Sequence, residues 1–163
     1  MLQTRRDLTL TLLLLHAGLR VAEVCALTLD DLTLTERKGA IKVQQGKGMK
    51  QRNVPLNATA LRALQAWLKV RPEADHRRVF TGSGGEPLQA RGVQHRLAEL
   101  GRLAKVAVTP HTLRHTFAKN LVDAGVTLEK VAALLGHSSL NTTRVYTTPS
   151  ALDLEKAVAL VGE

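Results

Sequence analysis

An apolar run near the start of the chain, residues 8–15, limits the possible folds more than any other feature. Threonines interrupt the run and Asp7 precedes it, which argues against a secretory signal. It is also shorter than the ~18 apolar residues that a membrane span needs. We therefore expect a buried helix that stops at Gly18, in a cytoplasmic protein with no membrane segment. Thr4 and Asp7 have the spacing of a capping box at the start of this helix.

The remaining pattern predicts a mostly helical α+β domain with one small antiparallel sheet. Turns that contain glycine separate three short segments, residues 32–35, 41–45 and 52–55, which we expect to pair as strands. Asn57 is the expected cap of the following helix. Further helices are expected at residues 20–27, 90–104, 111–124, 128–135, 140–146 and 151–160, with a candidate strand at 79–80.

Charge is the clearest pointer to a partner. The 163 residues carry a net charge of +9, and residues 37–119 alone hold 17 basic and 4 acidic side chains. This excess indicates a polyanion partner, nucleic acid first, although a solvated basic surface is the alternative. A single cysteine excludes a disulfide scaffold and a zinc ribbon. The chain has only four aromatic side chains, which is too few for a surface on which the bases of single strands stack. The backbone of a nucleic-acid duplex is therefore the favoured ligand.

Several short motifs hold residues with catalytic potential. His111 and Arg114 share one face of the expected helix, and Tyr146, the only tyrosine, follows His137 by nine residues. Each motif alone is weak evidence. Zinc is a rival explanation for His111 and His115, but the helix lacks the glutamate of a metalloprotease and Arg114 would repel a cation. We therefore expect no metal. The candidates are Arg20, Lys47, His111, Arg114, His137 and Tyr146.

These residues stand in five segments that occur in a familiar order. The segments are Gly18-Leu19-Arg20-Val21-Ala22-Glu23-Val24, Gly46-Lys47-Gly48, His111-Thr112-Leu113-Arg114-His115, Leu135-Gly136-His137-Ser138 and Thr142-Thr143-Arg144-Val145-Tyr146. In this order they resemble the catalytic domain of tyrosine recombinases of the phage-integrase and Xer type. The resemblance spans essentially the whole chain, and one residue that departs from it is Ala22, where many relatives have Ser or Gly.

The resemblance implies a role for each candidate. Tyr146 would be the nucleophile and Lys47 the acid for the leaving oxygen, while Glu23 would support the site. The catalytic arginines and histidines would be Arg20, Arg114, His111 and His137. Neither a metal nor ATP would be needed, so no cofactor is expected. Backbone contacts to DNA are expected from Lys50, Arg52, Arg91, Arg96, His115 and Lys119.

The resemblance also implies an organisation and a function. Residues 1–163 would form one catalytic domain, and the family's N-terminal core-binding domain is absent from this chain. The expected function is site-specific recombination or integration of duplex DNA through a 3′-phosphotyrosyl intermediate. A DNA-binding fragment without turnover and a type IB topoisomerase remain alternatives. Self-association into a synaptic tetramer on DNA is expected, with the helix at 151–160 as the candidate contact.

Overall fold

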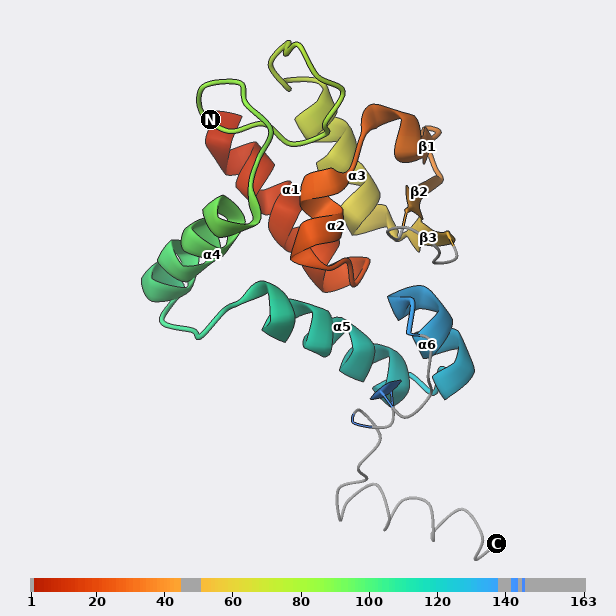
Figure 1. Cartoon of the computed structure of the whole chain (residues 1–163). Coiled ribbons are helices and arrows are strands. Elements are labelled where there is room, and N and C mark those ends of the chain that lie inside the picture. The colour runs from red at the N-terminus through yellow and green to blue at the C-terminus, as the bar shows by residue number, and fades with distance from the viewer. Residues whose placement is uncertain (1, 45–50, 138–141, 144, 146–163) are drawn as a thin grey trace, which may run out of the picture.

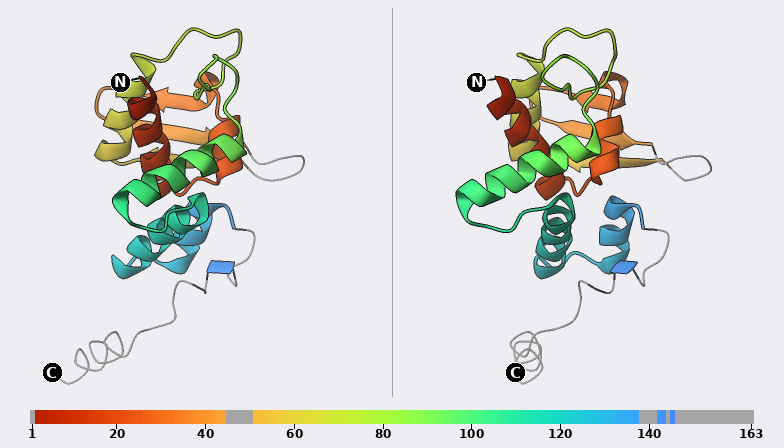
Figure 2. Two further views of the ribbon diagram at one scale, coloured as in Figure 1. Left: turned by 90° about the vertical axis from the view of Figure 1, so that its left-hand side faces the viewer. Right: turned by 60° about the vertical axis from the view of Figure 1, so that its left-hand side comes forward.

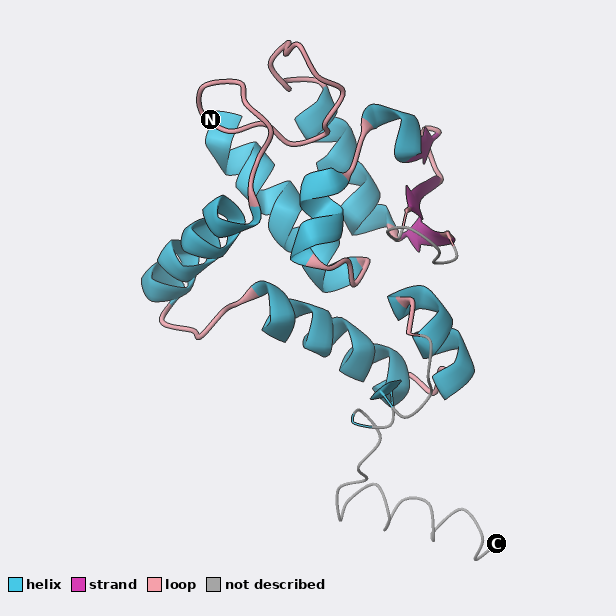
Figure 3. Ribbon diagram, in the orientation of Figure 1, coloured by secondary structure: helices cyan, strands magenta, loops and turns pink. Residues whose placement is uncertain are grey.

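The chain folds into helices with one small sheet packed at their side, as Figures 1 and 3 show. A computed structural model describes residues 2–44, 51–137, 142, 143 and 145. Its elements in chain order are α1 (Leu2–His16), α2 (Val21–Ala26), the 3-10 helix η1 (Leu29–Asp31), β1 (Leu32–Leu34), β2 (Gly39–Val43), β3 (Arg52–Leu56), α3 (Ala58–Leu68), α4 (Ala90–Ala104), α5 (Pro110–Asp123) and α6 (Leu128–Leu135). The predicted α+β class is confirmed. None of the described helices is long and apolar enough to span a membrane.

Helix α1 lies at the centre of the core. Leu13 and Leu14 are fully buried, and α2, α3 and α5 all pack against the helix. The buried helix predicted from the apolar run is therefore confirmed. The predicted capping box is wrong, because α1 begins at Leu2 and leaves both Thr4 and Asp7 inside the helix.

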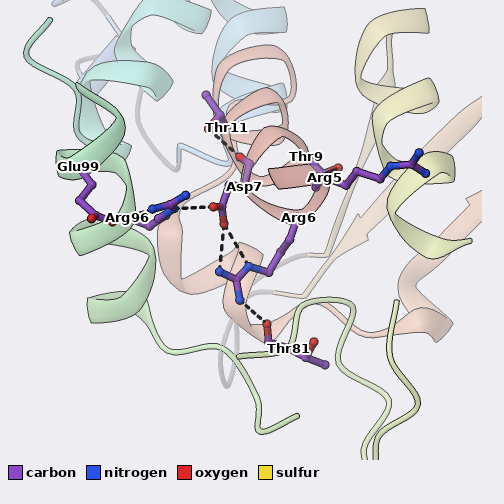
Figure 4. A network of polar contacts seen from close by, with 8 residues as sticks. All are labelled: Arg5, Arg6, Asp7, Thr9, Thr11, Thr81, Arg96 and Glu99. Carbon is purple, nitrogen blue, oxygen red and sulfur yellow. Dashed lines mark hydrogen bonds and ion pairs between the residues drawn. The ribbon is translucent and has the colours of Figure 1, made fainter. Parts of the chain in front are cut away.

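Asp7 instead joins α1 to α4 through a buried network of charges (Figure 4). Its side chain is only 3% exposed and binds Arg6 at 3.1 Å and Arg96 at 2.5 Å. Arg6 also donates to the carbonyl of Thr81 at 2.9 Å, and Arg96 donates to Glu99 at 2.7 Å. Because a buried carboxylate must be paired, these arginines are structural. The expected contact of Arg96 with the DNA backbone stays a prediction beside this structural role.

The sheet has the predicted three strands, in the order β1-β2-β3 with both pairs antiparallel. Ile41 of β2 lies opposite Val54 of β3, and both side chains are buried against the helices. Side chains two residues apart on a strand point to the same face, so Arg52 shares the inward face of Val54. Strand β3 begins at Arg52, which places this arginine at the end of the sheet that adjoins α6.

The candidate strand at residues 79–80 does not form. The described structure holds only isolated bridges nearby, between Thr28 and Arg78 and between Thr81 and Pro87. The polar groups of Val79 are satisfied in other ways, since its N–H donates to a loop carbonyl and its own carbonyl accepts from the Trp67 indole at 2.9 Å. With both groups paired, no neighbouring strand is needed.

Helix α3 confirms the predicted cap, because the Asn57 side chain accepts from the N–H of Ala60 at 2.9 Å. One face of α3 is buried against α1, including Leu64 and Trp67. The Trp67 ring stacks on Phe80 with centroids 6.1 Å apart. The apolar spacing read from the sequence is therefore the core face of this helix.

Helices α5 and α6 form a pair at one end of the molecule, where α5 packs against α1, and α4 lies on the side that Figure 2 turns toward the viewer. Pro110 occupies the first turn of α5, and Thr109 caps the helix by accepting from Thr112 N–H at 3.1 Å. Gly136 ends α6 with φ of +69°, as the glycine stop predicted. The residue after this stop is His137, so the end of α6 fixes where that histidine lies.

Gly18→Ala tests the close approach between the end of α1 and this helix pair. Gly18 has φ of +61°, and an added Cβ would lie 2.3 Å from Phe117 Cδ1. We expect the free energy of unfolding to fall by about 2–5 kcal/mol, from backbone strain and overpacking together. Urea denaturation measures this loss.

Gly125→Ala is the matched control for Gly18→Ala. Gly125 also has a positive φ, +78°, but an added Cβ meets nothing within 4 Å. Only the conformational penalty of about 1–2 kcal/mol remains. Equal destabilisation of the two variants would contradict a steric role for Gly18.

Candidate active site

Arg20 lies where the chain turns from the end of α1 into α2. The first N–H groups of a helix lack partners, and the Glu23 carboxylate turns back to accept from Arg20 N–H at 2.8 Å. The other oxygen of Glu23 accepts from Nη1 of the Arg20 side chain at 3.0 Å. The side chain of Arg20 is nevertheless 42% exposed. Its guanidinium is therefore held from one side and open to a ligand on the other.

A second arginine, Arg52 of β3, binds the same carboxylate. Its Nη1 and Nη2 donate to the two oxygens of Glu23 at 2.9 and 2.8 Å, and its Nε donates to the carbonyl of Leu134 at 2.8 Å. The side chain is only 8% exposed. The burial of this side chain and its three bonds within the protein argue against the expected contact of Arg52 with DNA.

The two arginines determine the charge of Glu23. Burial opposes ionisation of this carboxyl group, but hydrogen bonds from Arg52 and from Arg20 N–H, together with both positive charges, hold its pKa below the usual range. Glu23 is therefore a carboxylate at neutral pH. Because the pKa is lowered by folding, this stabilisation is present at neutral pH and is lost as the pH falls through the lowered pKa.

Arg114 of α5 reaches the same place from the opposite side. Its side chain is buried, and it donates from Nη1 to the carbonyl of Gly18 and from Nη2 to the carbonyl of Leu135 at 2.7 Å. Leu134 and Leu135 are the last two residues of α6, where carbonyls lack helical partners and a positive charge is favoured. Arg52 and Arg114 thus complete the end of α6 from two directions.

His137 follows directly on this end of the helix. Its Nε2 lies 3.3 Å from Nη2 of Arg114, and its Nδ1 lies 3.0 Å from the hydroxyl of the buried Thr143. A guanidinium only donates, so Nε2 is the accepting nitrogen and the proton sits on Nδ1. Burial, and then the charges of Arg114, Arg20 and Arg52, lower the pKa of His137. The imidazole is therefore neutral at pH 7.

Of the remaining predicted residues, the structure describes four and leaves three outside the described part of the chain. His111 is exposed in the first turn of α5, and Arg91 is exposed on α4. Lys119 is also exposed and pairs with Asp123 at 3.1 Å. His115 is half-buried. Lys47, Lys50 and Tyr146 fall outside the part of the chain that the structure describes.

Comparison with known proteins agrees with this geometry. The sequence matches the Phage integrase family over residues 2–152. The chain belongs to the phage integrase family. It is 38% identical over 156 residues to tyrosine recombinase XerA of Pyrococcus furiosus, in an alignment that covers 94% of this chain and 54% of XerA. The resemblance read from the five sequence segments is thereby confirmed.

Solved structures of recombinases also resemble the structure of this chain. The crystal structure of XerA recombinase superposes with a TM-score of 0.82 at 27% identity, covering 99% of this chain and 64% of that one. The XerH site-specific recombinase bound to its difH substrate gives 0.79 at 29% identity, covering 99% and 48%. The chain spans about half the length of the curated relatives it matches.

Sequence reasoning missed the contacts that two residues make within this candidate site. Arg52 was assigned to the DNA surface, although its place two residues before the buried Val54 on one strand was a signal that it faces inward. Thr143 lies inside the last of the five segments, but no role was assigned to it, and its contact with His137 joins residues six positions apart.

The zinc alternative can be compared with the geometry of α5. The rings of His111 and His115 lie with centroids 6.5 Å apart and planes tilted by 43°. Within the described residues, no group of three or more His, Cys, Asp or Glu side chains is placed to hold a metal ion. What this integrase-family site offers a ligand is the positive charge of its arginines.

Proposed function

We propose that residues 1–163 are the catalytic domain of a site-specific recombinase or integrase that cuts and rejoins duplex DNA. The observation that supports this best is the meeting of Arg20, Arg114 and neutral His137 around the end of α6. Guanidinium groups match the planar oxygens of a phosphate and stabilise the charge that builds on them during cleavage. The XerH relative is described as bound to its difH substrate, which supports DNA as the ligand here.

The reaction that we propose is a transesterification. The Tyr146 oxygen attacks the phosphorus, the bond from phosphorus to the 5′ oxygen breaks, and Lys47 protonates that leaving oxygen. A histidine of the site, His111 or His137, takes the proton of the tyrosine hydroxyl. The bond energy is kept in a 3′-phosphotyrosyl ester, so no ATP is consumed. Attack by a 5′ hydroxyl from another strand reverses the step and completes recombination.

A covalent trap on DNA tests this proposal. The chain is incubated in EDTA with a pool of nicked duplexes of randomised sequence, and denaturant-resistant adducts are recovered. The nick lets the short 5′ fragment diffuse away, so the tyrosyl ester accumulates. We expect an adduct in the presence of the chelator. Binding without an adduct would favour the DNA-binding fragment, and relaxation of a supercoiled plasmid without strand exchange would favour the topoisomerase alternative.

Affinity for duplex DNA should depend strongly on salt. Residues 37–119 hold 17 basic and 4 acidic side chains, and some of the basic ones, such as Arg91 on α4, are exposed to solvent. Each phosphate contacted releases condensed counterions, so log affinity should fall against log salt with a slope of roughly −0.9 per contact. Fluorescence anisotropy across a salt series measures the slope, and a flat dependence would contradict a backbone-dominated interface.

We also propose that the chain self-associates on DNA through residues 151–160. Leu152, Leu154 and Val158 in this segment, and Val161 just after it, form a set of apolar side chains outside the described residues. A helix this short is marginal alone and needs a surface to pack on. Deleting residues 151–163 should therefore reduce the size of the protein–DNA assembly in sedimentation velocity. Unchanged assembly and cleavage would indicate that the segment only covers its own domain.

A further inference from the structure

Two arginines share one carboxylate at the candidate site, but only one of them is open to a ligand. Arg20 is 42% exposed and makes one side-chain contact to Glu23, whereas Arg52 is 8% exposed and binds both oxygens. Arg20 also reaches both oxygens, through its N–H and its Nη1, but only the paired donors of Arg52 come from another element and hold the carboxylate against β3 and the end of α6. The orientation of Glu23, and through it that of Arg20, therefore depends on Arg52.

The net charge of the candidate site also depends on Arg52. Arg20 and Glu23 alone form a neutral pair, which has little net attraction for a phosphate. Arg52 adds one positive charge on the same carboxylate, so the group of three is net positive. Because Arg52 and Glu23 are largely shielded from water, their interaction is screened less than that of a surface pair. The open guanidinium of Arg20 consequently keeps its positive field toward solvent.

Arg52 also connects separate elements of the site. Its Nε donates to the carbonyl of Leu134, one residue before the carbonyl that Arg114 uses and three before His137. It opens β3, and Lys47 lies five residues earlier in the sequence. One buried side chain thus joins α2, β3 and the end of α6, each of which lies next to or near a candidate catalytic residue in the sequence.

We propose that Arg52 is a positioning residue, which fixes Glu23 against α6, orients Arg20 and keeps the Arg20–Glu23 pair net positive toward the scissile phosphate. It acts through these neighbours and touches no substrate. The inference rests on the proposed function for its effect on cleavage. Its effect on the neighbouring histidine is independent of that function and can be measured in the free protein.

The test compares Arg52→Met with Arg52→Lys and with the control Arg96→Met. Arg52→Met removes both the positive charge and the paired N–H donors of the guanidinium. Arg52→Lys keeps the charge but replaces the paired donors with one ammonium group. Arg96→Met breaks a contact to the buried Asp7 away from the site, so it matches the loss of a structural ion pair. Urea denaturation of all three gives the stability against which the other readouts are compared.

The first readout is the pH titration of the His137 ring by NMR without DNA. The charged groups around this ring are Arg114 from α5, Arg20 and Glu23 from the turn into α2, and Arg52 from β3. We expect the pKa of His137 to rise toward its usual value in Arg52→Met, and to stay unchanged in Arg52→Lys and Arg96→Met. An unchanged titration in Arg52→Met would overturn the electrostatic part of the proposal.

The second readout is single-turnover cleavage of the nicked duplexes at saturating protein. We expect Arg52→Met to lose about 10²-fold in rate, as a misplaced reacting group does, with little change in the half-saturating protein concentration. The loss should shrink on a duplex whose scissile phosphate is an uncharged methylphosphonate. Arg52→Lys should cleave faster than Arg52→Met. If Arg52→Met does not fold, the comparison is made between Arg52→Lys and the wild type.

The outcomes separate this inference from the proposed function. Wild-type cleavage by Arg52→Met, or an equal loss in an equally destabilised Arg96→Met, would overturn a positioning role. If the wild-type chain itself forms no adduct, the proposed function fails. The titration of His137 still decides whether Arg52 sets the charge of the site.

Discussion

Tyr146→Phe is expected to form no covalent adduct with DNA. Tyr146 is the only tyrosine of the chain, and the change removes only the oxygen that would attack phosphorus. Duplex affinity should stay within about tenfold of wild type, since at most one hydrogen bond is lost. The nicked-duplex trap measures the adduct, and fluorescence anisotropy measures binding.

Val145→Ala is the control for this substitution. Val145 precedes the tyrosine and its side chain is 68% exposed, so trimming it should preserve adduct formation. An adduct that persists in Tyr146→Phe would show that another residue is the nucleophile. Loss of the adduct in both variants would point to a local change of structure instead of the missing oxygen.

Arg114→Met should damage both the fold and the chemistry. The carbonyls of Gly18 and Leu135 would lose a buried donor, which lowers the free energy of unfolding by about 2–5 kcal/mol. Removing a guanidinium from the phosphate should slow cleavage by about 10²–10³-fold, as loss of a transition-state hydrogen-bond donor does. Urea denaturation and single-turnover cleavage, at a temperature where the variant is folded, measure the two effects.

Lys119→Met on the same helix separates these effects from a general loss of positive charge. Lys119 is exposed and pairs only with Asp123 one turn away among the described residues, so its removal should leave stability near the wild-type value. Its cleavage rate at saturating protein should also be preserved. A similar loss of rate in both variants would contradict a specific role for Arg114.

Local signals in the sequence were sufficient for most of the fold. Gly18 and Gly136 end helices with positive φ, and Asn57 caps α3, because each acts through its own backbone neighbourhood. The helix at residues 90–104 has the predicted bounds, and the second helix, α2, lies within the predicted 20–27. The errors arose where distant partners decide, as at residues 79–80, whose backbone is satisfied by a loop and by Trp67.

The same distinction between local signals and distant partners holds for the candidate site. The motif order identified Arg20, Glu23, Arg114 and His137, and the structure brings these four together. Charge alone does not tell which arginines pair within the protein, as Arg52 and Arg96 do with the carboxylates of Glu23 and Asp7. Such pairings join residues 29 and 89 positions apart, and no local pattern encodes them.

The two arginine contacts at the end of α6 have a consequence for the timing of synthesis. Arg52 reaches a carbonyl 82 positions further along the chain, and Arg114 joins Gly18, 96 positions earlier, to Leu135. During synthesis, Arg20 leaves the ribosome long before residues 134 and 135 are added. Contacts between residues this far apart form late, because the chain between them must first be ordered. The cluster of Arg20, Glu23, Arg52 and Arg114 can therefore assemble only after synthesis has passed the end of α6.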